Sequence, residues 1–311
     1  MQAAPFFDDV AGGPDGGAAH WLSTSDDLKI RVGHWTAPGV HGTVLLFPGR
    51  TEYVEKYGRA AKSLLEHGFA TVAVDWRGQG LADRMANDRG LGHVNAFTDY
   101  QRDVAAMLDH VRALGLPSPY YLIAHSMGGC IGLRALMQGL PVNAAMFSAP
   151  MWGIGMGRLL RPVAWGISTM SRQFGFDMRV APGQDTSNYL ERVAMNENEL
   201  THDPEMFAYM QAQLRAHPEL GLGGPSLRWL NEALVETRQL AARPSPDVPT
   251  LTFLGMQETI VDPLRVRRRM GEWPSGQLTV LPRCKHEGMM ESVDVRTRIF
   301  DATAAHFNAH P

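Results

Sequence analysis

This chain of 311 residues has few cysteines and a small net charge. Its two cysteines, Cys130 and Cys284, are too few for a disulfide framework and lack the spacing of zinc ligands. We therefore expect a protein of a reducing compartment, the cytoplasm, without a metal or organic cofactor. With a formal net charge of only −3, no face can be broadly basic without a matching acidic one, which argues against a general nucleic-acid binder.

Signals for secretion and for membrane insertion are also missing from the sequence. Residues 1–20 contain no Lys or Arg, so the chain does not open as a secretory signal does. The longest stretch without Asp, Glu, Lys or Arg, residues 135–157, is interrupted by Pro141 and Pro150. It is therefore expected to contain a helix end, a strand and a loop instead of a membrane span. The glycine-rich beginning predicts that residues 1–19 form a mobile N-terminal arm.

Short apolar runs recur along the chain and predict the strands of a sheet. The runs cover residues 28–35, 43–47, 70–74, 120–124, 142–147, 250–254 and 278–281. The first alternates apolar and polar residues, which indicates a half-exposed edge strand, whereas the later ones are continuously apolar, as in buried parallel strands. Helical patterns such as residues 57–67 and 97–114 separate them. This order predicts an α/β fold with a mostly parallel, doubly wound sheet.

One long interval, between residues 147 and 250, shows helical patterns and no convincing strand. We expect it to form a helical cap, residues 151–244, inserted before the last strands of a core made of residues 20–150 and 245–311. Eight of the 17 methionines lie between residues 146 and 210. Flexible methionines suit an adaptable apolar pocket as well as ordinary packing. The predicted substrate-binding residues are Met151, Trp152, Met206, Met210 and Trp229.

The strongest local signal for chemistry is Ser126. It follows the apolar run 120–124 directly and precedes a helical pattern, with small residues around it. This strand–turn–helix context is typical of a nucleophile elbow, in which a tight turn exposes the serine oxygen above the sheet. The usual motif begins with glycine, where this chain has Ala124, a residue still small enough for the turn. An ordinary serine at a helix N-terminus is the alternative.

A nucleophilic serine needs a base, and the base needs a carboxylate to orient it. His286 lies in the loop after the last predicted strand, so it is our candidate base. Glu258 and Asp262 both follow the strand at 250–254 and are candidate acids. Asp262 precedes Pro263 and a helical run, so a capping role explains it, and we favour Glu258. Backbone N–H groups of Arg50 and Met127 are the expected oxyanion hole.

These segments together resemble the α/β-hydrolase superfamily, and within it the branch of monoacylglycerol lipases, bacterial lysophospholipases and serine aminopeptidases. The matching segments are Pro-Gly-Arg-Thr-Glu-Tyr at 48–53, Asp-Trp-Arg-Gly-Gln-Gly at 75–80, His-Ser-Met-Gly-Gly at 125–129, Gly-Met-Gln-Glu-Thr-Ile-Val at 255–261 and Lys-His-Glu at 285–287. The resemblance spans residues 20–308 and implies the α/β-hydrolase fold and a Ser, acid, His chain order. Two positions depart from it, since many relatives have His in place of Pro48 and most have Asp in place of Glu258.

The residues and the resemblance together predict a serine hydrolase that cleaves carboxylic esters of single-chain lipids, monoacylglycerol or lysophospholipid, through an acyl-enzyme. No obligatory protein partner is expected. A serine aminopeptidase is the main rival, and it would need an acidic cap residue for the substrate ammonium group. The available residues are Glu191, Glu197, Glu199 and Glu205. A non-catalytic binding protein with this fold is a weaker rival. Arginines at 265 and 267–269 predict a solvated helix face, with contact to anionic lipid headgroups as the alternative.

Overall fold

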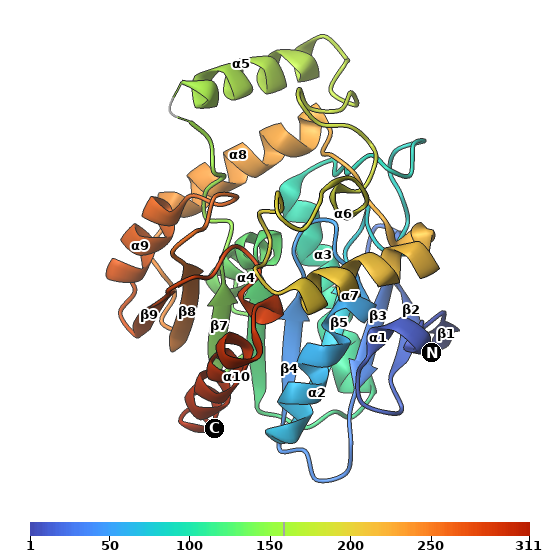
Figure 1. Ribbon diagram of the computed structural model, residues 1–311, viewed down its shortest axis with the longest axis vertical. Helices are drawn as coiled ribbons and strands as arrows, with labels where there is room; N and C mark the ends of the chain where they lie inside the picture. The colour runs from blue at the N-terminus through green and yellow to red at the C-terminus, as the bar shows by residue number, and fades with distance from the viewer. Residues whose placement is uncertain (158) are drawn as a thin grey trace.

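A single nine-stranded sheet runs through the computed structural model, which describes residues 1–157 and 159–311 (Figure 1). The strands lie side by side in the order β1-β2-β3-β5-β4-β6-β7-β8-β9. Their bounds are β1 (Gln2–Ala4), β2 (Ala18–Ser23), β3 (Lys29–Trp35), β4 (Gly42–Phe47), β5 (Phe69–Asp75), β6 (Tyr120–His125), β7 (Ala144–Ser148), β8 (Thr250–Gly255) and β9 (Gly276–Leu281). All seven strands predicted from the apolar runs are present, each within two residues of its predicted ends.

The six neighbouring strands β5, β4, β6, β7, β8 and β9 pair in parallel. Strands β1, β2 and β3 join this part of the sheet through antiparallel pairs. Alternate residues of each strand enter different cores. Leu45 and Phe47 of β4 face one core, and Val44 and Leu46 face the other. Since both faces are covered by apolar side chains, the inner strands are apolar along their whole length, as the sequence indicated.

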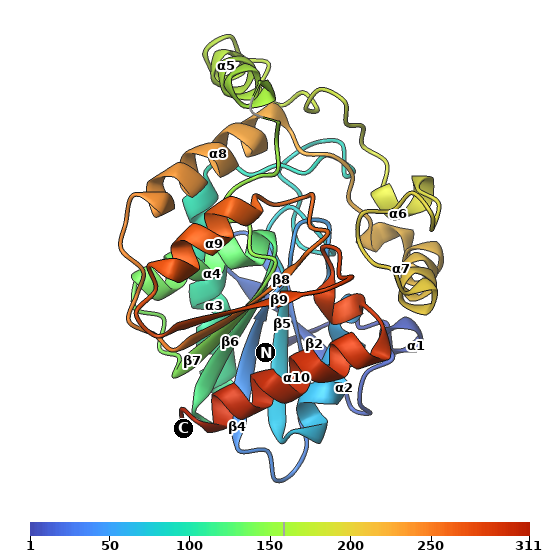
Figure 2. The same ribbon diagram turned by 60° about the vertical axis from the view of Figure 1, so that its left-hand side comes forward.

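Helices cover both faces of the sheet (Figure 2). One face carries α2 (Gly58–Glu66) and α10 (Val293–Asn308), and the other carries α3 (Tyr100–Ala113), α4 (Met127–Met137) and α9 (Pro263–Gly271). Short 3₁₀ turns are η1 (Val54–Tyr57), η2 (Phe97–Asp99), η3 (Pro218–Leu220) and η4 (Gly288–Met290). The predicted doubly wound α/β architecture is therefore confirmed.

The segment between β7 and β8 forms the helical cap. Its helices are α5 (Leu160–Gln173), α6 (Tyr189–Arg192), α7 (Pro204–Ala216) and α8 (Leu227–Ala241). Asp203 caps α7 by accepting hydrogen bonds from the amides of Glu205 and Met206, as the Asp-Pro pair indicated. Helix α5 packs on α8, while α6 and α7 lie together on the other side (Figure 2). Among the residues described, no helix is both long and apolar enough to cross a membrane.

The N-terminal segment corrects the prediction that residues 1–19 form a mobile arm. They contain β1, the short helix α1 (Asp8–Ala11) and the first residues of β2. The amide of Phe7 donates to Glu55, and Tyr209 of the cap donates to the carbonyl of Ala11 over 2.6 Å. Strand β3, expected at an edge, therefore has a neighbour on each side.

The glycines that suggested mobility serve close packing instead. A Cβ atom at Gly13 would lie 2.6 Å from the indole nitrogen of Trp35 and 3.2 Å from the backbone of Gly58. Gly12 ends α1 with a left-handed backbone, φ +57°. Glycine here allows the backbone to approach the core, and its abundance alone does not distinguish that role from flexibility.

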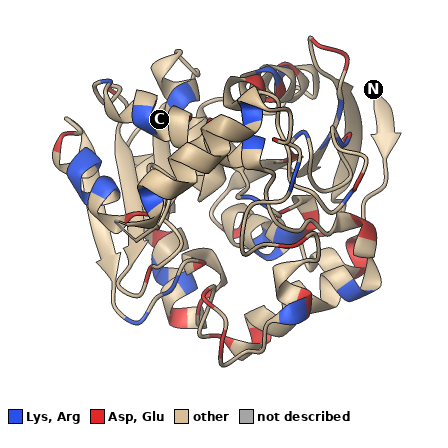
Figure 3. Ribbon diagram, turned by 90° about the horizontal axis from the view of Figure 1, so that it is seen from above, with Lys and Arg blue, Asp and Glu red and all other residues tan. Residues whose placement is uncertain are grey.

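The arginines of α9 match the predicted solvated face only in part, since Arg267 and Arg268 are exposed whereas Arg265 is half-buried. Arg269 is buried and donates to the carbonyl oxygens of Leu240 and Arg243, so it fixes the return from the cap to the sheet. Arg268 pairs with Glu272 on the same helix. In the view from above, basic and acidic residues are interspersed along the ribbon (Figure 3).

Candidate active site

Ser126 stands on a sharp turn between β6 and α4. Its backbone has φ +49° and ψ −117°, a conformation that residues with a side chain rarely adopt. The turn is possible because Gly128 and Gly129 follow, where a Cβ atom would lie 2.1 Å from the carbonyl oxygen of Phe47 and 2.5 Å from Pro150. The small residues after the serine thus permit the close approach that nucleophile elbows require.

His286 and Glu258 form a buried pair. The His286 Nδ1 atom lies 2.7 Å from Glu258 Oε2. An ionised carboxylate only accepts hydrogen bonds, so Nδ1 carries the proton and donates it, which leaves Nε2 free to take a proton. The other oxygen, Oε1, accepts from the amides of Ile260 and Val261 at 2.6 and 3.0 Å.

Opposing effects act on the pKa of Glu258. Burial alone would raise it, but the charge and hydrogen bond of His286 and the two backbone amides outweigh burial and lower the pKa below its usual range. The carboxylate therefore stays ionised at neutral pH, the state in which it stabilises a protonated imidazole.

Asp262 has a different environment. Its side chain caps α9 by accepting from the amides of Leu264 and Arg265, and it pairs with Arg161 at 2.9 Å. The structure thus brings Glu258 to His286, while Asp262 has the capping position that its neighbour Pro263 indicated.

A cavity of about 460 Å³ lies between the cap and the strand ends, and we call it the cap cavity. Ser126 and His286 line it together with Arg50 and Met127, so four of the five predicted catalytic and oxyanion residues meet there. Its apolar lining includes Met151, Ile154, Leu190, Leu200, Met210, Leu222, Trp229, Leu230 and Ile260.

Two of the five predicted substrate-binding residues do not line this cavity. Trp152 lies in the core, where its indole donates to the Gly129 carbonyl and its ring stacks on Trp273. Met206 is fully buried in a small cluster with Met290. Both predictions are wrong because composition marks apolar residues without showing which side of a cap element faces the core.

The expected oxyanion-hole residues occupy suitable backbone positions. Met127 is the first residue of α4, so its N–H has no partner within the helix. Arg50 belongs to the loop after β4, which is held by side chains from a neighbouring loop. Trp76 donates to the Pro48 carbonyl at 2.9 Å, and Gln79 donates to the Gly49 carbonyl at 2.8 Å.

The Arg50 side chain reaches into the cap. Its guanidinium donates to the carbonyl of Gly223 at 2.6 Å and lies over the ring of Trp229. Burial lowers the pKa of Arg50 to about 10, so the group keeps its positive charge at neutral pH. Among the residues described, no carboxylate pairs with it, although it lines the cap cavity.

Four buried charged residues beneath the serine were not predicted. Lys56 Nζ lies 2.6 Å from both Glu52 and Glu287, and His125 Nε2 lies 3.5 and 3.4 Å from the same two carboxylates. We call Glu52, Lys56, His125 and Glu287 the buried charge network. Glu52, His125 and Glu287 stand within the motifs that carry the family resemblance. That position was the signal from which the network could have been predicted.

Mutual attraction keeps the network charged in spite of burial. Burial disfavours the cations, but Glu287 and Glu52 raise the pKa of both His125 and Lys56 above their ordinary values. Burial likewise opposes ionisation of Glu287, yet His125 and Lys56 hold its pKa well below the usual range. Since the ammonium group of Lys56 already sits between the two carboxylates, the network is not a metal site.

Comparisons with known proteins agree with this geometry. A family model described as serine aminopeptidase, S33, matches residues 38–293. Lysophospholipase L2 of Escherichia coli K12 is 30% identical over 301 residues, covering 92% of this chain and 86% of that protein. The probable lysophospholipase L2 of Haemophilus influenzae is 27% identical over 302 residues, covering 96% and 92%. A solved soluble variant of monoglyceride lipase from Saccharomyces cerevisiae, 22% identical, covers 93% of this chain and 94% of that chain with a TM-score of 0.72. The α/β-hydrolase fold is thus confirmed.

The geometry predicts opposite outcomes for the two candidate acids. Glu258→Gln should fold normally and lower kcat for an ester about 10³- to 10⁴-fold, since a neutral amide neither orients nor stabilises the imidazolium. Asp262→Asn is the matched control, because asparagine also caps helices and the lost ion pair is worth about 1 kcal/mol or less. Its kcat should stay within about threefold of wild type. Steady-state kinetics that reverse this order would assign the acid to Asp262.

Proposed function

The chain belongs to the serine aminopeptidase S33 family, and on this premise we propose that it is a carboxylic ester hydrolase that cleaves single-chain lipids with Ser126 as nucleophile. The resemblance to the lysophospholipase and monoacylglycerol lipase branch is confirmed. The observation that carries the proposal is that Ser126, with its strained backbone, lies in the same cavity as His286. The Nδ1 atom of His286 is hydrogen-bonded to Glu258.

The proposed reaction has two halves. Ser126 Oγ attacks the ester carbonyl while His286 Nε2 takes its proton, and the amides of Arg50 and Met127 donate hydrogen bonds to the oxyanion. Collapse of this intermediate releases the alcohol, which receives the proton from His286, and leaves the acyl group on the serine. Water then attacks the acyl-enzyme and loses a proton to His286. Collapse of this second intermediate frees the fatty acid, while His286 returns the proton to Ser126 Oγ. Glu258 keeps the imidazole in the required tautomer throughout.

The cap cavity supports a lipid acyl group as substrate. Its apolar lining comes from the cap and from the loops after β7 and β8, and its volume is within the range of ligand pockets. Methionine side chains at 151 and 210 supply adaptable contacts for a flexible chain.

The aminopeptidase alternative needs a carboxylate for the substrate ammonium group. Of the four cap glutamates considered, only Glu199 lines the cavity, and it is exposed and accepts from Thr259. Glu205 pairs with Arg59, while Glu191 and Glu197 are exposed outside the cavity. Glu52 and Glu287 also line it, but Lys56 and His125 neutralise them. The cavity therefore favours an ester over an amine-bearing peptide.

A panel of nitrophenyl esters from acetyl to palmitoyl, run beside an aminoacyl anilide, tests this function. We expect kcat/KM to rise with chain length, by up to about 0.8 kcal/mol per buried methylene until the cavity is full, and the anilide to remain uncleaved. Ser126→Ala should keep the wild-type circular dichroism spectrum and lose turnover, and a fluorophosphonate should label wild type at Ser126 alone. Preference for the anilide, or labelling at another serine, would contradict the proposal.

Arg50 supports lysophospholipid as the preferred substrate within this class. It is a cation without a carboxylate partner among the described residues, and it lines the same cavity as the nucleophile. A lysophospholipid carries a phosphate near its scissile ester, whereas a monoacylglycerol has only hydroxyl groups. A guanidinium group binds phosphate through charge-assisted hydrogen bonds, so it would favour the phosphorylated substrate.

The test is Arg50→Gln, which keeps the backbone amide of the oxyanion hole. We expect kcat/KM for lysophosphatidylethanolamine to fall about tenfold, the effect of one charge-assisted hydrogen bond, and that for monoacylglycerol to change less than about threefold. Arg59→Gln, at a paired arginine outside the cavity, is the control. Equal losses on both substrates would show that Arg50 only holds the Gly223 loop.

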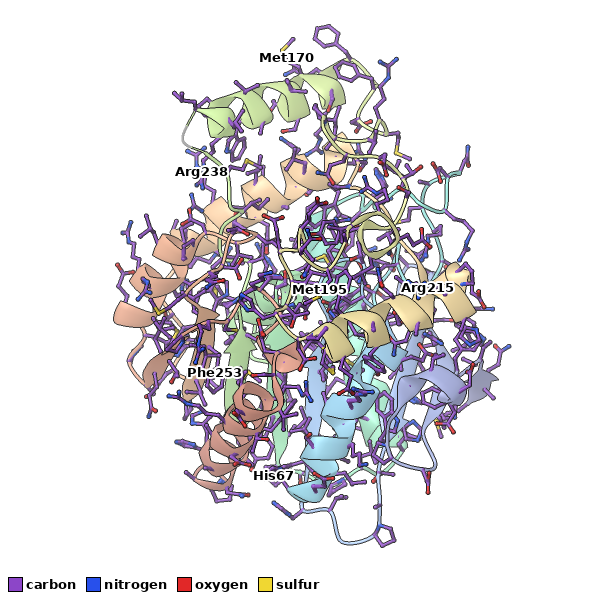
Figure 4. The ribbon with its side chains drawn as sticks, in the orientation of Figure 1. His67, Met170, Met195, Arg215, Arg238 and Phe253 are labelled. Carbon is purple, nitrogen blue, oxygen red and sulfur yellow. The ribbon has the colours of Figure 1, made fainter. Side chains whose placement is uncertain are left out.

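Helix α5 supplies a surface for contact with aggregated lipid. Its outward side carries large apolar residues, and Figure 4 shows Met170 there, beyond α8. More than half of each of the following is exposed: Leu159, Leu160, Val163, Met170 and Phe174. Exposed apolar patches of this kind mark interaction sites. We assign the chain to the cytoplasm because Cys130 and Cys284 are buried free thiols, with α5 as its contact to membrane surfaces.

Cell fractionation tests both the cytoplasmic assignment and the membrane contact through α5. Wild type should divide between the cytoplasmic fraction and the washed membranes. Met170→Gln with Phe174→Gln should move nearly all of it to the cytoplasmic fraction, because two exposed apolar contacts are lost. Leu264→Gln, which removes an exposed leucine from α9, is the matched control and should leave the division unchanged. Recovery with periplasmic markers, or equal shifts for both variants, would contradict the assignment.

A further inference from the structure

Three histidines meet where the N-terminal strands pack against α3, away from the cap cavity. His20 is on β2, His34 on β3 and His110 on α3. One ring nitrogen from each lies within 4.8 Å of those of the other two. The ring centroid of His20 is 5.5 Å from that of His34 and 5.0 Å from that of His110.

Strand register explains why two of these side chains share a face. His20 pairs with Val32, and His34 follows two residues after Val32, so both histidines project from the same side of the sheet. Helix α3 packs over β2 on this side and contributes His110 from its last turns. The group is therefore a product of the fold, from residues far apart in the sequence.

Each of the three histidines also has one buried ring nitrogen without a partner. Nδ1 of His20, Nδ1 of His34 and Nε2 of His110 are buried, and none of them has a hydrogen-bond partner among the described residues. His110 is 4% exposed. A buried polar atom left unpaired costs about 1–3 kcal/mol, so three at one place call for a ligand that all of them could bind.

We propose that His20, His34 and His110 form a binding site for a divalent first-row transition metal, with Zn²⁺ as the ion it suits best. Imidazole nitrogen is the ligand these ions prefer, and three histidines leave a fourth tetrahedral position for water. Zn–N bonds of about 2.0–2.1 Å require the three nitrogens to move closer, which rotations of the imidazole rings supply.

The surroundings keep the imidazoles of His34 and His110 in the form that binds metal. Burial, and then the neighbouring histidines, lower the pKa of His110 to about 4, and burial also lowers the pKa of His34. Neutral rings offer a lone pair at neutral pH without first losing a proton. The sequence predicted no metal because positions 20, 34 and 110 form no local ligand motif.

The three-histidine site lies far from Ser126, so its role would be structural. Strands β3, β5 and β4 lie between β2 and β6, so at about 4.8 Å per strand it is roughly 19 Å from the strand that carries Ser126. A bound ion would join β2, β3 and α3, and it would stabilise the N-terminal strands without entering the reaction. The inference is independent of the proposed function.

Zinc titration of metal-free protein without a polyhistidine tag tests the proposal, with a chromophoric chelator as competitor. Wild type should bind one equivalent of Zn²⁺ and unfold at a higher temperature when it is bound. His34→Gln should weaken Zn²⁺ binding about 100-fold or more and abolish that thermal shift. Esterase turnover should be the same with and without Zn²⁺.

Two further measurements keep the result decisive. His41→Gln removes an exposed histidine elsewhere, so its zinc affinity should equal that of wild type. If His34→Gln does not fold, Co²⁺ added to wild type decides, because three imidazole ligands produce a visible spectrum unlike that of the hydrated ion. An unchanged cobalt spectrum, or equal zinc affinities for wild type and a folded His34→Gln, would overturn the site.

Discussion

Lys56 lies between two buried carboxylates, and the three loops that meet at the serine depend on this contact. Glu52 belongs to the loop after β4, His125 directly precedes Ser126, and Glu287 directly follows His286. Removing one charge would leave another uncompensated in the interior, a loss of about 3–5 kcal/mol. The relative positions of Ser126, His286 and the loop after β4 are therefore fixed by charges that take no part in the proposed reaction.

A second set of buried charges connects the N-terminal segment to that network. Arg31 of β3 is fully buried between Glu55 and Asp75, at 2.7 Å from each, and also donates to the carbonyl of Pro5. Glu55 adjoins Lys56 in the chain. The Asp75 carboxylate accepts from the amide of Val54 at 2.8 Å, so the segment that contains Lys56 is held as well. The motif at 75–80 thus contributes position and no chemistry.

The sequence identified those features whose signals are local. The run 120–124 with its serine, and Asp262 with Pro263, each specify a short structure within a few neighbouring residues. Glu258 was separable from Asp262 for the same reason. Features decided by distant partners were missed. Trp152 is in the core, where its ring stacks on Trp273, and the Arg50 side chain is half-buried because it donates to the Gly223 carbonyl.

Attachment differs along the cap. Helix α8 is joined to α4 by the buried pair of Arg134 and Glu236, whereas α5 packs on α8 through polar contacts. Asn231 of α8 donates to Ser168, and Glu232 accepts from Arg172. Since the polar side of α5 faces the protein, its apolar side faces outward. Helix α8, which lines the cavity, is therefore anchored to the core by a buried ion pair, whereas α5 is held to α8 by polar contacts and leaves an apolar surface exposed.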